Sequence, residues 1–125
     1  MALATGHNAA VSDVTRRLAA RASAFSYADL PPDVVTVAKH CLLDWLGVTL
    51  AGASEPLTRL LLDQVREEGG QPQASLIGIG DKVSVPQAAL VNGAAGHALD
   101  YDDVVEALRG HPTAPVMPAA LAMAE

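Results

Sequence analysis

Apolar residues near the start of the chain recur every three or four positions, which is the spacing of an amphipathic helix. The pattern predicts a helix over residues 11–25, and Ser12 can cap its start. Its apolar stripe consists of Val14, Leu18, Ala22 and Phe25. Residues 1–10 lack this pattern and also lack the apolar core of a signal peptide, so we expect them to be disordered.

A long apolar stretch follows Pro31-Pro32-Asp33, where proline's fixed φ and an acidic side chain both suit the first turn of a helix. We expect this second helix to run to about Ala51 and to stop at Gly52. The predicted buried stripe consists of Val34, Val37, Ala38, Cys41, Leu42, Trp45, Leu46 and Thr49. Polar residues interrupt the stretch within the roughly 20 residues that a membrane span needs, so we interpret it as the core helix of a soluble protein.

A third helix is predicted to open at Glu55-Pro56 and to end at Gly69-Gly70, because glycine readily takes the positive φ of a C-cap. Its predicted inner stripe consists of Leu57, Leu60, Leu61 and Val65. The helical spacing of apolar residues then ends, and residues 74–85 are expected to form a short hairpin or an extended connector.

A fourth helix is predicted over Val85 to about Ala98, because Ser84 and Gln87 have the spacing of a capping box. Small residues share its faces, which indicates that a neighbouring backbone or a ligand approaches closely. Ala89 and Gly93 share one face with His97, and Gly96 shares the adjacent face with Asn92. A last helix is expected to begin near Thr113 or Pro115.

The composition agrees with an all-α fold. Half of the residues are hydrophobic but only 3% are aromatic, so the core must be built from small and aliphatic side chains, which favours closely packed helices. This apolar content is too high, and the charged fraction of 18% too low, for a disordered chain.

Net charge and cysteine content exclude several classes of function. The formal charge of −6 argues against nucleic-acid binding, which needs a basic patch to neutralise phosphates. The single cysteine, Cys41, can form no internal disulfide and cannot provide the several thiolates that usually hold a zinc ion or an iron–sulfur cluster. We expect a cytoplasmic protein that contacts no membrane.

Candidate chemistry is concentrated between the fourth and last helices, where two imidazoles and three carboxylates are close in sequence. They are His97, Asp100, Asp102, Asp103 and His111. An imidazole titrates near neutrality, and neighbouring carboxylates can orient it or shift its pKa, so this segment is suited to proton transfer.

Structural explanations exist for some of these residues. Asp102 or Asp103 could cap a short helix over 104–108 with Glu106 as the capping partner, and His97 could be a hydrogen-bonded core histidine. His40, four residues before Asp44, is expected to form a surface pair.

An ordered series of blocks carries a family resemblance. The blocks are Leu42-Leu43-Asp44-Trp45-Leu46-Gly47, Leu50-Ala51-Gly52, Ala88-Ala89-Leu90-Val91-Asn92-Gly93, His97-Ala98-Leu99-Asp100-Tyr101-Asp102-Asp103, His111-Pro112-Thr113 and Pro118 to Glu125. They resemble the N-terminal part of the MmgE/PrpD family, which includes 2-methylcitrate dehydratase, cis-aconitate decarboxylase and iminodisuccinate epimerase. The resemblance covers nearly the whole chain from Ser12.

The resemblance implies that residues 11–125 form part of a helical main domain, usually found in a homodimer, while later sequence supplies an α+β lid domain. Asp100 and His111 match active-site positions of the family, and His97 and Asp103 belong to the same motif. With Asn92, these two are expected to bind or support the substrate. The family's catalytic lysines and a further histidine lie beyond residue 125, so we expect a fragment, one subunit of a split enzyme or a relic.

The implied activity is that of an acid–base lyase or isomerase acting on a small di- or tricarboxylate, with no metal and no other cofactor. Binding such a substrate requires cations, and after Lys82 only Arg109 remains. We therefore expect a homo-oligomer or a complementary second subunit.

Two other functions remain open from the residues alone. The chain could be a non-catalytic helical assembly partner whose apolar surfaces complete a larger domain. Alternatively, Asp102, Asp103 and Glu106 could hold magnesium, as in enzymes that act on prenyl diphosphates.

Overall fold

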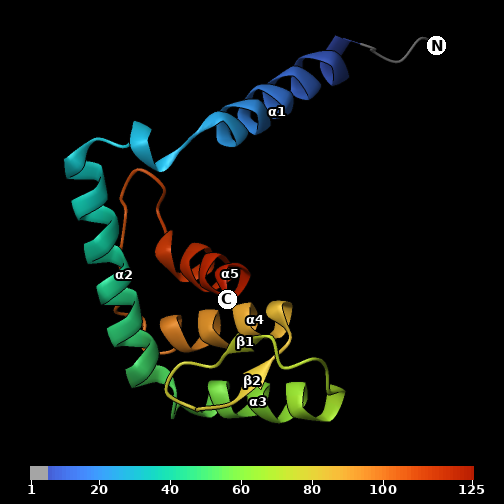
Figure 1. Ribbon diagram of the computed structural model, residues 1–125, viewed down its shortest axis with the longest axis vertical. Coiled ribbons are helices and arrows are strands. Elements are labelled where there is room, and N and C mark those ends of the chain that lie inside the picture. Colours follow the sequence, from blue (N-terminus) through green and yellow to red (C-terminus); the bar gives the residue numbers. More distant parts are fainter. Residues whose placement is uncertain (1–5) are drawn as a thin grey trace. The chain divides into compact units, whose positions relative to one another are not determined.

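The computed structural model describes residues 6–125, with side chains described from residue 13 onward, and over this range it confirms the predicted all-α class (Figure 1). The helices are α1 (Gly6–Ala24), α2 (Pro32–Gly52), α3 (Pro56–Glu68), α4 (Val85–His97) and α5 (Thr113–Ala124), with a short 3-10 turn at Tyr27–Asp29. Strands β1 (Ala74–Ser75) and β2 (Lys82–Val83) form a small hairpin. Of the segment expected to be disordered, residues 1–5 lie outside the described part of the chain, and α1 includes the rest.

The chain divides into two compact units, Met1–Val35 and Thr36–Glu125. In the first unit, the apolar residues Val14 and Leu18 of α1 are exposed, and the Arg21 guanidinium lies 5.5 Å from the centre of the Phe25 ring. After α1 ends, the Ser26 N–H donates to Asp29 Oδ2 at 2.9 Å, which fixes the 3-10 turn before α2.

Helix α2 begins and ends where its proline and glycine signals predict, but its buried face is shorter than predicted. Trp45 and Thr49 are fully buried, whereas Val34 and Val37 are 44% and 59% exposed, so the predicted stripe is wrong for the first half of the helix. Apolar spacing identifies the face of a helix but not how far along it a neighbour extends. Among the described helices, α2 alone is long and apolar enough to cross a membrane by length and composition.

Helix α3 has its predicted bounds and the predicted positive φ of 68° at Gly69, but its predicted inner stripe is right only for Leu61 and Val65, which belong to or pack against the core. Thr58 and Val65 are buried, whereas Leu57 and Leu60 are exposed. The Thr58 hydroxyl donates to the carbonyl oxygen of Gly52 at 2.7 Å, so a polar side chain can be buried on this face without an unpaired group.

The segment over 74–85 forms the predicted hairpin, with Ala74 opposite Val83 and Ser75 opposite Lys82 in antiparallel register. Helix α4 contacts the hairpin and lies between α5 and α3 (Figure 1). The predicted capping box at its start is confirmed, because the Ser84 N–H donates to Gln87 Oε1 at 3.1 Å. The core of this unit is formed by Val65, Ala74, Leu76, Val83, Ala88, Val91 and Ala122.

The C-terminal end of α5 is tied to the hairpin through Glu125. Its carboxylate accepts hydrogen bonds from the Ser75 N–H (3.1 Å), the Ser75 hydroxyl (2.7 Å) and Lys82 Nζ (3.0 Å). The bonds from Ser75, followed by that from Lys82, lower the pKa of Glu125 from 4.5 to about 2.

Glu125→Gln should therefore lower the stability of the fold at neutral pH. Because the carboxyl has a lower pKa folded than unfolded, its contribution is present above pH 4.5 and is lost as the pH falls toward about 2. Urea unfolding of both proteins should show a difference at neutral pH that shrinks in acid. A difference independent of pH would mean that the charge of Glu125 does not stabilise this contact.

Small residues allow the helices of this unit to approach closely, as predicted from α4. A Cβ atom added to Gly96 would lie 2.7 Å from Trp45 Nε1, and one added to Gly52 would lie 2.0 Å from the carbonyl oxygen of Ala95. A Cβ at Gly93 would lie 3.4 Å from the carbonyl oxygen of Ala114. Helix α4 therefore packs closely against both α2 and α5.

Gly52→Ala should destabilise the protein by about 1–3 kcal/mol, since the new methyl group would meet a backbone carbonyl that cannot move away. Gly47 is the matched control on the same helix, because a Cβ added there has no neighbour within 4 Å. Gly47→Ala should raise stability by about 0.5–1 kcal/mol, the usual gain from removing a glycine inside a helix. Urea unfolding followed by circular dichroism measures both, and equal effects would contradict the close crossing of α2 and α4.

Candidate active site

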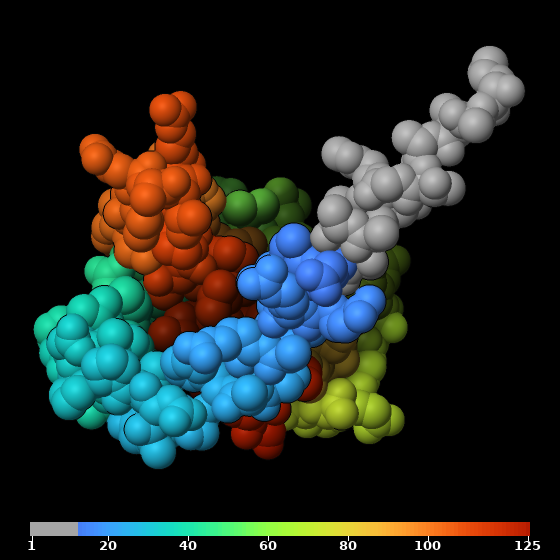
Figure 2. All heavy atoms as spheres, turned by 90° about the horizontal axis from the view of Figure 1, so that it is seen from above, coloured from blue at the N-terminus to red at the C-terminus, as the bar shows by residue number. Residues whose placement is uncertain are grey.

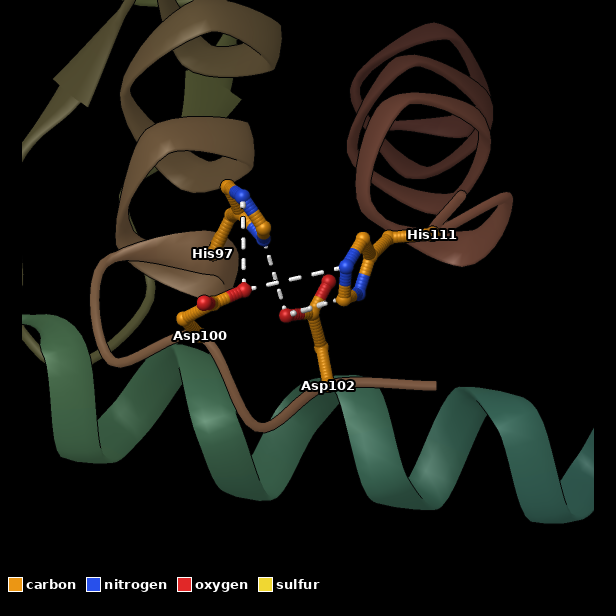
Figure 3. A group of neighbouring side chains, drawn as sticks. All are labelled: His97, Asp100, Asp102 and His111. Atoms are coloured by element: carbon orange, nitrogen blue, oxygen red, sulfur yellow. Dashed lines mark hydrogen bonds and ion pairs between the residues drawn. The ribbon is translucent and has the colours of Figure 1, made fainter. Parts of the chain in front are cut away.

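Four titratable side chains converge where α4 ends and α5 begins. They are His97, Asp100, Asp102 and His111, and Figure 3 shows them pointing toward one another from α4, the segment after it and the residues before α5. Asp100 has a φ of 53°, a left-handed conformation that Asp tolerates better than most residues. Its N–H donates to the His97 carbonyl at 3.1 Å, so the turn directly after α4 brings this carboxylate back toward the imidazole of His97.

Asp102 is the buried centre of this cluster, with only 1% of its side chain exposed. Its Oδ1 atom lies 2.9 Å from His97 Nδ1, at hydrogen-bond distance, and 3.3 Å from His111 Nδ1. In the neutral His97 ring the proton is therefore on Nδ1, and Nε2 keeps its lone pair. Two buried atoms of the cluster have no hydrogen-bond partner in the described part of the chain. They are Asp102 Oδ2 and His111 Nδ1.

Asp100 lies on the open side of the cluster, with 78% of its side chain exposed. Its Oδ1 atom is 3.9 Å from His97 Nε2 and 3.7 Å from His111 Nε2. The two imidazole rings are 4.7 Å apart between centroids. Each ring therefore has one nitrogen toward a buried carboxylate and the other toward an exposed one.

This environment favours the protonated form of His97. The hydrogen bond to Asp102 raises the pKa of His97, and the charges of Asp102 and Asp100 act in the same direction, while partial burial opposes them. A protonated imidazole in this position can donate its proton to a bound ligand.

A cavity of about 530 Å³ lies beside the imidazoles. Its lining consists of Ala89, Leu90, Gly93, Ala94, His97, His111, Ala114 and Pro115. The small residues of α4 thus leave space next to the two rings. This described lining contains neither lysine nor arginine.

Asp103 and Asn92 lie outside the cluster of four and bind other groups. Asp103 accepts hydrogen bonds from the Thr113 N–H (3.2 Å) and the Thr113 hydroxyl (2.6 Å), which fixes the start of α5 next to His111. Asn92 accepts from the Ile77 N–H and donates to the Ser75 carbonyl, both at 2.9 Å. Their contacts support the fold around the site, and contact with a substrate remains a prediction for both.

The segment between Asp103 and Thr113 differs from one expectation. No helix forms over 104–108, where the described backbone instead makes turns closed by an isolated bridge between Val105 and Gly110, so the suggested capping by Glu106 is wrong. This loop stands out from the surface (orange in Figure 2). The loop can turn back because Arg109 adopts a positive φ of 49°.

The acidic triplet suggested for magnesium is not assembled. Asp102 pairs with His97, Asp103 pairs with Thr113, and Glu106 is exposed in the loop. The sequence placed Asp102 among the carboxylates that could orient an imidazole, but it did not single out Asp102 as a site residue between the two rings. Its position inside the His97 to Asp103 motif was the available signal.

His40 and Asp44, which were expected to pair at the surface, lie on α2 and outside the cluster of four. His40 and Asp44 are both exposed on α2, and the described residues include no ion pair between them. The expected surface position is confirmed, and the pairing is not.

Comparison with known proteins gives consistent matches. The family model of the MmgE/PrpD N-terminal domain matches residues 16–125. The cis-aconitate decarboxylase-like protein oryM of Aspergillus oryzae is 29% identical over 113 residues, which are 90% of this chain and 23% of the relative. The cis-aconitate decarboxylase of Aspergillus terreus is 29% identical over 116 residues, 93% of this chain and 24% of the relative.

The chain thus spans about a quarter of the length of the curated relatives that it matches. The matched region includes α2 to α5 and all four residues of the cluster. The family match covers most of the chain, and its motif residues converge in space: this chain belongs to the MmgE/PrpD family.

Proposed function

We propose that this protein contributes the acid–base part of the active site of a lyase or isomerase that acts on a small di- or tricarboxylate. The observation that carries the proposal is the placement of two imidazoles between a buried and an exposed carboxylate, beside a cavity. Dehydration, decarboxylation and epimerisation next to a carboxylate all require proton transfer at carbon, which such a group can perform.

His111 and Asp100 are the groups that we assign to proton transfer. With Nδ1 facing Asp102, His111 directs Nε2 toward Asp100 and the open side of the site. In a dehydration, this nitrogen takes a proton from the carbon next to a carboxylate while a protonated group gives a proton to the departing hydroxyl. In a decarboxylation, carbon dioxide leaves and the electron pair of the broken bond stays on the remaining carbon. The same site then donates a proton to that carbon.

His97 is assigned a supporting role that depends on its protonated form. Its raised pKa makes it a proton donor and a positive charge close to the reacting centre. None of these steps requires a metal ion or another cofactor, so we propose metal-independent chemistry.

Binding of the substrate's carboxylates requires cations from elsewhere. Because the described lining of the cavity contains neither lysine nor arginine, we propose that further sequence of the protein or a second subunit supplies them. The relatives named as cis-aconitate decarboxylases suggest aconitate or a close relative as the substrate. A cytoplasmic homo-oligomer, bound to neither membrane nor nucleic acid, fits this role.

The test is turnover of cis-aconitate followed by proton NMR, without added iron. The 125-residue chain alone should be nearly inactive, and activity should appear when the lysine-bearing sequence or subunit is added. Asp100→Asn should impair that activity by removing a charge at nearly unchanged volume. Full turnover by the isolated chain would show that its own cations bind the substrate. It would contradict the proposal that other sequence or a second subunit supplies them.

One observation favours a second candidate function, that of a non-catalytic assembly partner. Large apolar side chains are exposed on several elements, among them Leu43, Leu60, Leu90 and Met123. Surfaces of this kind often bind other proteins. Size-exclusion chromatography with mass determination would detect assembly, and an assembled form without turnover of any polycarboxylate would favour this function over the enzymatic one.

A further inference from the structure

Three atoms of the cluster described above can act as ligands of one metal ion. They are His97 Nε2, His111 Nε2 and Asp100 Oδ1 (Figure 3). The carboxylate oxygen lies 3.9 Å from the first nitrogen and 3.7 Å from the second. Such atoms repel one another unless a proton or a cation lies between them.

We propose that His97, His111 and Asp100 form a binding site for a divalent transition-metal ion, with Zn²⁺ as the best fit, and that the bound ion blocks proton transfer. Two imidazole nitrogens and one carboxylate oxygen are a common protein ligand set for zinc, with the fourth position left to water. Nitrogen ligands favour zinc over magnesium, which prefers oxygen alone.

The two distances from Asp100 to the imidazoles require only a small contraction. Zinc lies about 2.0–2.2 Å from nitrogen and oxygen ligands, so two ligands of a tetrahedral ion are about 3.3 Å apart. The observed separations of 3.7 and 3.9 Å are a few tenths of an ångström larger. Asp100 is exposed and its side chain can move, so its carboxylate can approach an ion held by the imidazoles.

Asp102 supplies the second observation in favour of a metal. Histidines that bind metals usually donate their other N–H to a carboxylate, which fixes the ring and makes the ligating nitrogen more basic. Asp102 Oδ1 lies 2.9 and 3.3 Å from the Nδ1 atoms of His97 and His111, so one buried carboxylate faces both rings. The contact with His97 is a hydrogen bond, and this arrangement leaves both Nε2 atoms for the proposed ion.

The charge of the cluster also favours a cation. Two carboxylates lie within 4 Å of the imidazoles, and in the described part of the chain no lysine or arginine pairs with either of them. Asp102 is almost completely buried, and its Oδ2 atom has no hydrogen-bond partner there. A protonated His97 would supply one positive charge against two carboxylates, whereas a divalent ion would supply two and would stabilise the cluster further.

Binding of the ion and its effect on turnover are separable consequences. The binding site follows from the geometry alone, whereas inhibition rests on the proposed function. The ion would occupy the Nε2 lone pair of His111, which the proposed mechanism uses as a base, so an occupied site cannot take a proton.

The binding test uses the 125-residue chain and Co²⁺, whose visible absorption reports coordination, followed by displacement with Zn²⁺. We expect saturable binding of one ion per chain, lost in His111→Ala and in His97→Ala. Asp102→Asn keeps the volume of the side chain and both ligating nitrogens, and it should weaken binding by about 10–100-fold. Far-ultraviolet circular dichroism of each variant verifies folding.

His40→Ala is the matched control, because His40 is an exposed histidine on α2 and has no part in the cluster. It should bind Co²⁺ like the unchanged protein. Absence of saturable binding, or binding that survives both His97→Ala and His111→Ala, would overturn the proposed site.

Inhibition is tested on the form of the protein that turns over substrate, with Zn²⁺ occupancy measured by displacement of Co²⁺. Activity should fall in proportion to occupancy and return when a chelator is added. Full activity at full occupancy would overturn the blocking effect while leaving the binding site in place. Conversely, Co²⁺ binding by a protein that has no turnover in any form would refute the proposed function and not the metal site.

Discussion

Replacement of His111 by alanine should lower kcat by a factor of about 10² to 10⁴, which is the usual contribution of a general acid or base to the rate. The imidazole is held with Nδ1 3.3 Å from the buried Asp102 and Nε2 3.7 Å from the exposed Asp100, at the edge of the cavity. Alanine removes the proton-transferring nitrogen and leaves the hydrogen bonds of Asp103 to α5 in place. The measurement is steady-state turnover of the active form of the protein, together with its helical circular dichroism.

His40→Ala is the control for this prediction as well. It should leave kcat unchanged and change the free energy of unfolding by no more than about 0.5 kcal/mol, as is usual for an exposed position. Full turnover by His111→Ala, with loss of turnover in His40→Ala, would place the active site elsewhere.

Asp102→Asn should lower kcat by a factor of about 10² while leaving KM nearly unchanged. Asp102 is buried behind the imidazoles, so it acts on catalysis through their orientation and charge, and a small misplacement of a reacting group can cost this much. The amide keeps the volume but removes the charge that favours a protonated His97. NMR titration should therefore also show a lower pKa for His97 in the variant.

Asp44→Asn is the matched control, since it makes the same chemical change at an exposed position on α2. It should alter neither kcat nor the titration of His97. If Asp102→Asn raised KM and left kcat intact, Asp102 would be acting in substrate binding and not in orientation of the imidazoles.

The sequence predicted the helices well because their ends are encoded locally. Proline at the start of α2, the Ser84 and Gln87 pair at the start of α4, and glycine at Gly69 act through the nearest few residues. The buried face of α3 depends on α4 and the hairpin, which lie far along the chain. The predicted stripe therefore gave the helix correctly but its buried face only at Leu61 and Val65.

The same distinction applies to the site. His97, Asp100 and His111 were predicted from the types of residue gathered in one segment and from the family resemblance. The place of Asp102 depends on how the chain turns after α4, where Asp100 adopts a left-handed conformation and directs the following residues inward. Local spacing carries no information on that turn, so the sequence left open whether Asp102 orients an imidazole or caps a helix.

The two hydrogen bonds between Asp103 and Thr113 give the loop over 104–112 a fixed base and leave its tip exposed. They join the two ends of the loop, so the length and sequence of the loop tip can drift while the closing residues stay in register. His111 lies inside this closure but next to its fixed end, and Val104, Glu106 and Arg109 are exposed at the tip. Changes in the tip should therefore leave the position of His111 unchanged.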